Sequence, residues 1–144
     1  MHGFLEARVA DYMTPGVVSV SPRATVLELE DLFTTHDFNG VPVLEDGALA
    51  GVVTKFDLLK VFEFTGQNVM PLYDQLGRLT AGQIMTRDPI TFPPDAPLAR
   101  VLQTLIALRV KSFPVLDGPR LVGIIAREDV VRALRDAREV KRSV

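Results

Sequence analysis

The stretch Gly51-Val-Val-Thr-Lys-Phe-Asp57 returns 72 positions later as Gly123-Ile-Ile-Ala-Arg-Glu-Asp129. The same shift places residues 9–62 on residues 81–134 without a gap. The matching positions include prolines and a glycine that set the backbone, a Met-Thr pair, small or aliphatic residues and one carboxylate. They are Met13-Thr14 with Met85-Thr86, Pro22 with Pro94, Ala24 with Ala96, Pro42-Val43-Leu44 with Pro114-Val115-Leu116, Leu49 with Leu121, Gly51 with Gly123 and Asp57 with Asp129. This duplication predicts two similar units of about fifty residues around a pseudo-two-fold axis, so that any cleft between them comes as a related pair.

The composition is that of a compact globular domain. Of the 144 residues, 47% are hydrophobic, enough for a buried core, and 24% are charged, too many for a membrane protein. No apolar run approaches the roughly 18 residues that span a bilayer, and the N-terminal sequence shows no secretory signal. The chain has no cysteine, which excludes disulfides and thiolate metal sites, and its net charge of -2 gives no drive toward nucleic acid. We therefore expect a cytoplasmic protein with no membrane or nucleic-acid partner.

Each unit opens with the same two predicted elements. The runs Val17–Val20 and Ile90–Phe92 follow a Met-Thr pair, are rich in β-branched or aromatic residues and end at a proline, which predicts a first strand. Residues Thr25–His36 and Pro97–Leu108 carry apolar side chains at helical spacing. This spacing predicts an amphipathic helix with one face on a core.

A hairpin and a second helix complete each unit. The hairpins are predicted at Val41–Leu44 with Leu49–Val53 and at Phe113–Leu116 with Leu121–Ile125, and the second helices begin at Lys55 and Arg127. The fold class is therefore α+β, with the order strand–helix–strand–strand–helix occurring twice. We expect the repeats at residues 8–64 and 79–136, a connection at 65–78, and a helix end or tail at 137–144. We also expect residues 63–78 to pack on the repeats.

The segment from Thr54 to Asp57 has two readings. Thr-x-x-Asp at the start of a helix is close to a capping box, in which the hydroxyl accepts an early helix N–H and the acid lies near the positive helix end. A carboxylate there can also accept hydrogen bonds from two adjacent hydroxyls, as a ribose presents them. A helix N-terminus beside it suits a phosphate.

The second copy favours the ligand reading. Ala126 replaces the threonine and cannot cap, yet Asp129 remains at the same offset. An acid kept for capping alone would lose much of its reason once the hydroxyl is gone, although the helix dipole still favours it.

The pair of units resembles tandem cystathionine β-synthase (CBS) domains, also called a Bateman module. The resemblance is carried by the Met-Thr pairs, by Val41-Pro-Val43 and Phe113-Pro-Val115, and by Gly-x-x-Thr/Ala-x-x-Asp after each hairpin, and it covers residues 8–136. It implies a regulatory module that binds AMP, ADP, ATP or S-adenosylmethionine between the repeats. It also implies a sensor that regulates another protein through a change of shape or of partner affinity.

The resemblance also implies which residues hold the ligand. In the main cleft Asp57 would hold the ribose hydroxyls and Thr54 would lie near the phosphates, with adenine and phosphate contacts from Asn39, Thr86, Pro89, Ile90 and Lys111. The second cleft would use Asp129 with Thr14, Val17 and Val18. Because Ala126 lacks the hydroxyl and Asn39 stands where the main cleft has Lys111, we expect the second cleft to bind more weakly.

Other functions are less favoured by the sequence. The two histidines are far apart, no nucleophile–base set is evident, and we expect neither a metal site nor catalysis, with no cofactor other than the regulatory ligand. The rival hypothesis is a ligand-free scaffold with degenerate clefts. A homodimer is expected, because the helix after the first hairpin is apolar on more than one face, at Phe56, Leu58, Leu59, Val61 and Phe62. The alternative is that residues 63–78 of the same chain cover this helix.

Overall fold

The computed structural model describes residues 3–63 and 73–142, with Tyr73, Asp74 and residues 140–142 described by their backbone alone. The described chain forms two compact units. Unit 2 is one continuous stretch, residues 18–89, and unit 1 combines residues 1–17 with residues 90–144. The expectation that residues 63–78 pack on the repeats falls largely on residues 64–72, which lie outside the described residues.

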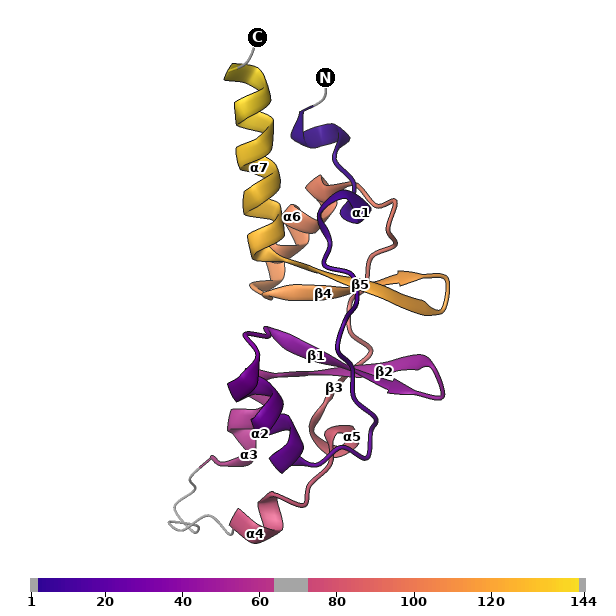
Figure 1. Ribbon diagram of the computed structural model, residues 1–144, viewed down its shortest axis with the longest axis vertical. Helices are drawn as coiled ribbons and strands as arrows, with labels where there is room; N and C mark the ends of the chain where they lie inside the picture. The colour runs from indigo at the N-terminus through magenta and orange to yellow at the C-terminus, as the bar shows by residue number, and fades with distance from the viewer. Residues whose placement is uncertain (1–2, 64–72, 143–144) are drawn as a thin grey trace. The chain divides into compact units, whose positions relative to one another are not determined.

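Unit 2 is a small antiparallel sheet with helices on one side (Figure 1). Its strands are β1 (Gly40–Glu45), β2 (Ala48–Thr54) and β3 (Thr86–Arg87), in the order β1-β2-β3. The hairpin closes through Asp46 and Gly47, both with positive φ, as a tight two-residue turn requires. The helices are α2 (Val26–Thr35), α3 (Lys55–Val61), α4 (Tyr73–Leu76) and α5 (Ala81–Ile84), and the core contains Leu29, Val43, Val53 and Ala81.

Unit 1 repeats this plan with a longer last helix (Figure 1). Its hairpin is β4 (Ser112–Asp117) with β5 (Arg120–Ala126), and its helices are η1 (Phe4–Glu6, a 3-10 turn), α1 (Val9–Tyr12), α6 (Leu98–Leu108) and α7 (Arg127–Arg142). The core includes Leu98, Val101 and Ile125, and the rings of Phe92 and Phe113 pack edge to face at 5.1 Å. Within the residues described, no helix is long and apolar enough to cross a membrane.

The predicted helices and hairpins are confirmed, but the predicted first strands are reduced to single bridges. Val20 pairs with Val43, and Phe92 pairs with Val115, each in parallel. In the first case Val20 N–H donates to the Pro42 carbonyl and Leu44 N–H donates to the Val20 carbonyl. The next bond of a parallel ladder would need an N–H from Pro42, which has none. Pro114 imposes the same limit in the second repeat, so neither run extends into a strand.

Each Met-Thr segment lies across the hairpin of the other repeat. Thr86 pairs with Val52 in β2, and Thr14 exchanges both main-chain hydrogen bonds with Ile124 in β5. A Cβ added at Gly51 would lie 2.6 Å from the Thr86 carbonyl oxygen, and one at Gly123 would lie 2.9 Å from that of Thr14. The glycines and the Met-Thr pairs, which match between the repeats in sequence, are therefore contact partners in space.

We predict that Gly51→Ala destabilises the protein. The added methyl meets the backbone of Thr86 and the sulfur of Met85 at 2.7 Å, and overpacking of this kind costs about 1–3 kcal/mol. Gly82→Ala is the matched control, since its methyl meets Pro22 at 3.2 Å inside α5, where alanine is the better helix former. Thermal unfolding should show a midpoint several degrees lower for Gly51→Ala and a smaller change for Gly82→Ala. Equal midpoints for the two variants would contradict the close contact.

Candidate functional site

Thr54 and Asp57 form a complete capping box at the start of α3. The Thr54 hydroxyl oxygen accepts the Asp57 N–H at 3.1 Å, and Asp57 Oδ2 accepts the Thr54 N–H at 2.9 Å. Thr54 has extended backbone angles, as an N-cap residue does, because β2 runs directly into the helix. The capping reading of this segment is therefore correct, and it fixes where the carboxylate lies.

The Asp57 carboxylate has a second partner, the hydroxyl of Thr86. Thr86 Oγ1 lies 3.2 Å from both carboxylate oxygens and donates its proton to them. Thr86 is exposed and Asp57 is half-buried, so this hydrogen bond forms next to solvent. All of these partners are neutral, and an ionised carboxylate offers about four acceptor positions. Hydroxyl groups of a ligand can exchange with Thr86 here without removing a charged partner.

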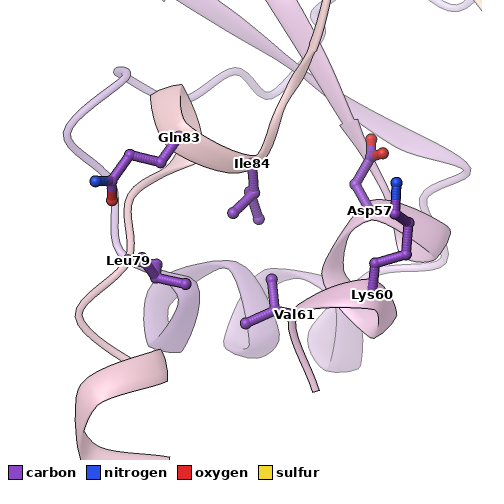
Figure 2. Close-up of a pocket in the computed structure, with 6 residues that line it drawn as sticks. All are labelled: Asp57, Lys60, Val61, Leu79, Gln83 and Ile84. Carbon is purple, nitrogen blue, oxygen red and sulfur yellow. The ribbon is translucent and has the colours of Figure 1, made fainter. Parts of the chain in front are cut away.

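A cavity of about 300 Å³ lies beside Asp57 in unit 2. Figure 2 shows Asp57 and Lys60 of α3 on one side and Gln83 of α5 on the opposite side. Its remaining lining is apolar and consists of Val61, Leu79 and Ile84. Among the sequence-predicted residues only Asp57 lines this cavity. The Lys60 ammonium lies over the Phe56 ring, 5.7 Å from its centroid.

The other residues predicted for the main cleft are divided between the two units. Asn39, directly before β1, and Pro89 belong to unit 2 and are half-buried. Ile90 and Lys111 belong to unit 1, where both are exposed and the Lys111 carbonyl accepts the Arg127 N–H. The structure thus brings together Thr54, Asp57 and Thr86 within one unit. The parts that Ile90 and Lys111 play stay predictions.

Among the residues predicted for the second cleft, Asp129 is buried and both of its carboxylate oxygens have a partner. Oδ2 accepts the Ala126 N–H at 2.8 Å, and Oδ1 lies 3.2 Å from an Arg132 guanidinium nitrogen. Burial raises the pKa of the Asp129 carboxyl, and the bonds from Ala126 and Arg132 offset part of this effect. Thr14 and Val17 share unit 1 with Asp129, whereas Val18 lies in unit 2.

This geometry corrects the argument from the second copy. The sequence suggests that an acid loses much of its capping role once the hydroxyl is replaced by Ala126. The acid half of the box survives, because Asp129 still accepts the main-chain N–H of residue 126. The persistence of the carboxylate is therefore explained by helix capping alone and does not by itself indicate a ligand.

Arg132 and Tyr12 were missed by the sequence reasoning. Arg132 donates to the Tyr12 carbonyl at 3.0 Å and lies over its ring at 5.5 Å, and the Tyr12 hydroxyl donates to Asp136 at 2.8 Å. The 72-residue shift places Lys60 on Arg132, so a cation recurs three residues after each aspartate. That recurrence was the available signal. No group of three or more metal-ligating side chains gathers anywhere in the described part of the chain.

The sequence matches one known family over most of its length. The family model described as CBS domain matches twice, at residues 9–63 and 81–136. The CBS domain-containing protein YhcV of Bacillus subtilis is 28% identical over 122 residues, which cover 85% of this chain and 81% of that protein. The chain spans 13% of the length of an A-adding tRNA nucleotidyltransferase from Geobacter sulfurreducens, to which it is 27% identical.

Solved structures show the same fold. The CBS-pair protein CBSX2 from Arabidopsis thaliana superposes with a TM-score of 0.77 at 29% identity, over 94% of this chain and 96% of that one. CBSX2 has also been solved in complex with AMP (TM-score 0.78, 28% identity, 91% and 98% covered). The CBS domain pair of protein MJ0100, in complex with 5'-methylthioadenosine and S-adenosyl-L-methionine, gives a TM-score of 0.72 at 26% identity over 88% and 98%. This chain therefore belongs to the CBS domain family, as a tandem pair of CBS repeats.

Proposed function

We propose that this CBS pair is a regulatory module that binds an adenosine-containing ligand, with Asp57 as the residue that holds the ribose. The observation that carries the proposal is the Asp57–Thr86 contact, in which one hydroxyl donates to both oxygens of a half-buried carboxylate. Two similar proteins, CBSX2 and MJ0100, have been solved with AMP and with 5'-methylthioadenosine and S-adenosyl-L-methionine. All three molecules contain a ribose.

The ribose fits the chemistry of Asp57 for a simple reason. A vicinal diol offers two hydroxyl donors about as far apart as the two oxygens of a carboxylate, and hydrogen bonds to a charged acceptor are the stronger kind. The capping bond from Thr54 N–H holds the carboxylate in one orientation before the ligand arrives. A ligand that binds a preorganised group loses less free energy to ordering.

The hydroxyl of Thr54 can also donate a hydrogen bond to the phosphate of a ligand. Its hydroxyl oxygen accepts the Asp57 N–H, so its own proton stays available to donate to a phosphate oxygen. The contacts expected from Asn39, Thr86 and Pro89 in unit 2, and from Ile90 and Lys111 in unit 1, belong to the same proposal. Occupancy would alter the shape of the pair or its affinity for a protein that it regulates.

A ligand-free homodimerisation scaffold is the second candidate, and one observation favours it. In unit 1 an apolar hollow of about 370 Å³ between α6 and α7 is lined by Ile106, Val131 and Leu134 among others. Ile106 is 70% exposed and Val131 is 64% exposed within this one hollow, and contiguous exposed apolar surface of this kind marks interaction sites. In α3 of unit 2, Phe56 and Leu59 are each 68% exposed, while Leu58, Val61 and Phe62 are half-buried. We propose that a second copy of the chain covers such surfaces.

We predict that Asp57→Ala weakens the binding of AMP by about ten- to a hundred-fold. The loss of a hydrogen bond to a charged group costs about 1.5–3 kcal/mol, and each 1.4 kcal/mol is a factor of ten in affinity. Isothermal titration with AMP, ADP, ATP and S-adenosylmethionine measures this effect. Asp31→Ala on α2 removes the same charge from an exposed position and should leave the affinity unchanged.

A thermal melt of the same variants separates ligand binding from capping. Both Asp57→Ala and Thr54→Ala should lower the melting midpoint, because each removes half of the capping box, and an N-cap is worth about 1 kcal/mol. If Asp57→Ala lowers the midpoint and leaves every titration unchanged, Asp57 caps a helix and the ribose proposal is wrong.

We also predict that Val131→Asp shifts the protein from dimer to monomer. A charge placed in a largely apolar interface loses its hydration on association, which opposes association. Light scattering at micromolar concentration measures the mass. Leu5→Asp is the matched control, because Leu5 is 76% exposed, lies in η1 and does not line the α6–α7 hollow. A wild-type protein that is already monomeric at this concentration would remove the dimer proposal.

A further inference from the structure

The two repeats place the same pair of charges in register but connect them differently. The shift of 72 residues aligns Asp57 with Asp129 and Lys60 with Arg132. In unit 1 the cation pairs with its own carboxylate, since an Arg132 guanidinium nitrogen lies 3.2 Å from Asp129 Oδ1. In unit 2 the Lys60 ammonium lies over the ring of Phe56, and the ion pairs of the described residues do not include Asp57.

The different position of the aromatic ring in each unit accounts for this difference. Unit 2 has its ring at Phe56, on α3 itself, where unit 1 has Glu128. Unit 1 has its ring at Tyr12, on α1, where unit 2 has Ile84. A cation is attracted to the face of an aromatic ring, so Phe56 holds Lys60 along α3, and Tyr12 together with its carbonyl holds Arg132 toward α1. Arg132 then lies beside Asp129.

The two carboxylates consequently differ in what a ligand must displace. Asp129 has a side chain only 7% exposed, with one oxygen held by the guanidinium and the other by the Ala126 N–H. A ribose diol would have to replace a charged partner of a buried carboxylate. At Asp57 it would have to replace one solvent-exposed hydroxyl, that of Thr86.

We propose that Arg132 is a specificity-determining residue: its ion pair keeps Asp129 in a structural role and prevents it from binding a ribose. The pair of CBS repeats then binds one adenosyl ligand per chain. This proposal rests on the proposed function of Asp57 and extends it to stoichiometry. It replaces the earlier grounds for a weaker second cleft, which were the missing hydroxyl at Ala126 and the amide at Asn39. Arg132 also joins Asp129 to the main chain of Tyr12, and so fastens α1 to α7.

The first test exchanges the two arrangements between the repeats and uses AMP as the probe. Wild-type protein should bind one AMP per chain in isothermal titration. Arg132→Lys with Tyr12→Ile and Glu128→Phe gives unit 1 the residues of unit 2, and should add a second binding event that Asp129→Asn removes. Lys60→Arg with Ile84→Tyr and Phe56→Glu makes the reverse change and should weaken AMP binding by at least ten-fold. Two AMP per wild-type chain, or a folded unit 1 variant that still binds one, would overturn the proposal.

The second test needs no ligand and examines the ion pair between Arg132 and Asp129 directly. It therefore still tests the role of Arg132 if wild-type protein binds no AMP, an outcome that would refute the proposed function. Carbon-detected NMR follows the titration of the Asp129 carboxyl in wild-type protein and in Arg132→Gln. Loss of the cation should raise the pKa of Asp129 further, whereas Lys60→Gln, which removes the matching cation of unit 2, should leave the Asp129 titration unchanged. An Asp129 titration that does not respond to Arg132→Gln would show that the ion pair is absent, and the proposal would be wrong. Circular dichroism of each variant verifies that it is folded.

Discussion

The close approach of each Met-Thr segment to a glycine is the constraint on which the rest of this structure depends. At Gly51 and Gly123 a Cβ would lie under 3 Å from a main-chain carbonyl oxygen, so only glycine lets the segments pass there. The approach lets Thr86–Arg87 pair with β2, and that pairing carries the Thr86 hydroxyl to the carboxylate of Asp57. The candidate site is thus built by two segments nearly 30 residues apart in the chain, and a missing side chain makes their meeting possible.

Much of the fold follows from the sequence because its signals are local. Apolar spacing located α2 and α6 to within a residue, and the Asp46-Gly47 turn located the first hairpin. The predicted first strands are wrong for a reason that is also local but lies in the neighbouring strand. Pro42 and Pro114 lack the N–H that would extend the pairing. Strand formation depends on the neighbour as much as on the run itself, and periodicity within Val17–Val20 carries no information about Pro42.

The site was predictable in its residue types and less so in their partners. Thr54 and Asp57 were placed correctly at a helix start because capping acts over three residues. Whether a cation three residues after the aspartate forms an ion pair with it depends on rings at Phe56 and Tyr12, the second of which is more than a hundred residues from Arg132. The same local motif therefore serves a half-buried carboxylate with neutral partners in one repeat and a buried ion pair in the other.

Unit 1 combines two segments that are far apart in the sequence, and this has a consequence for synthesis on the ribosome. Unit 2 is continuous, so its hairpin, its helices and its core are complete in sequence once residue 89 has left the exit tunnel. Residues 3–17 emerge before unit 2, yet the strand, helix and aromatic ring that they pack against lie beyond residue 90. They must therefore wait for α7, with Val9 and Tyr12 unburied in the meantime. Unit 2 can thus fold while unit 1 is incomplete, and unit 1 closes only when the segments that precede and follow unit 2 in the sequence meet.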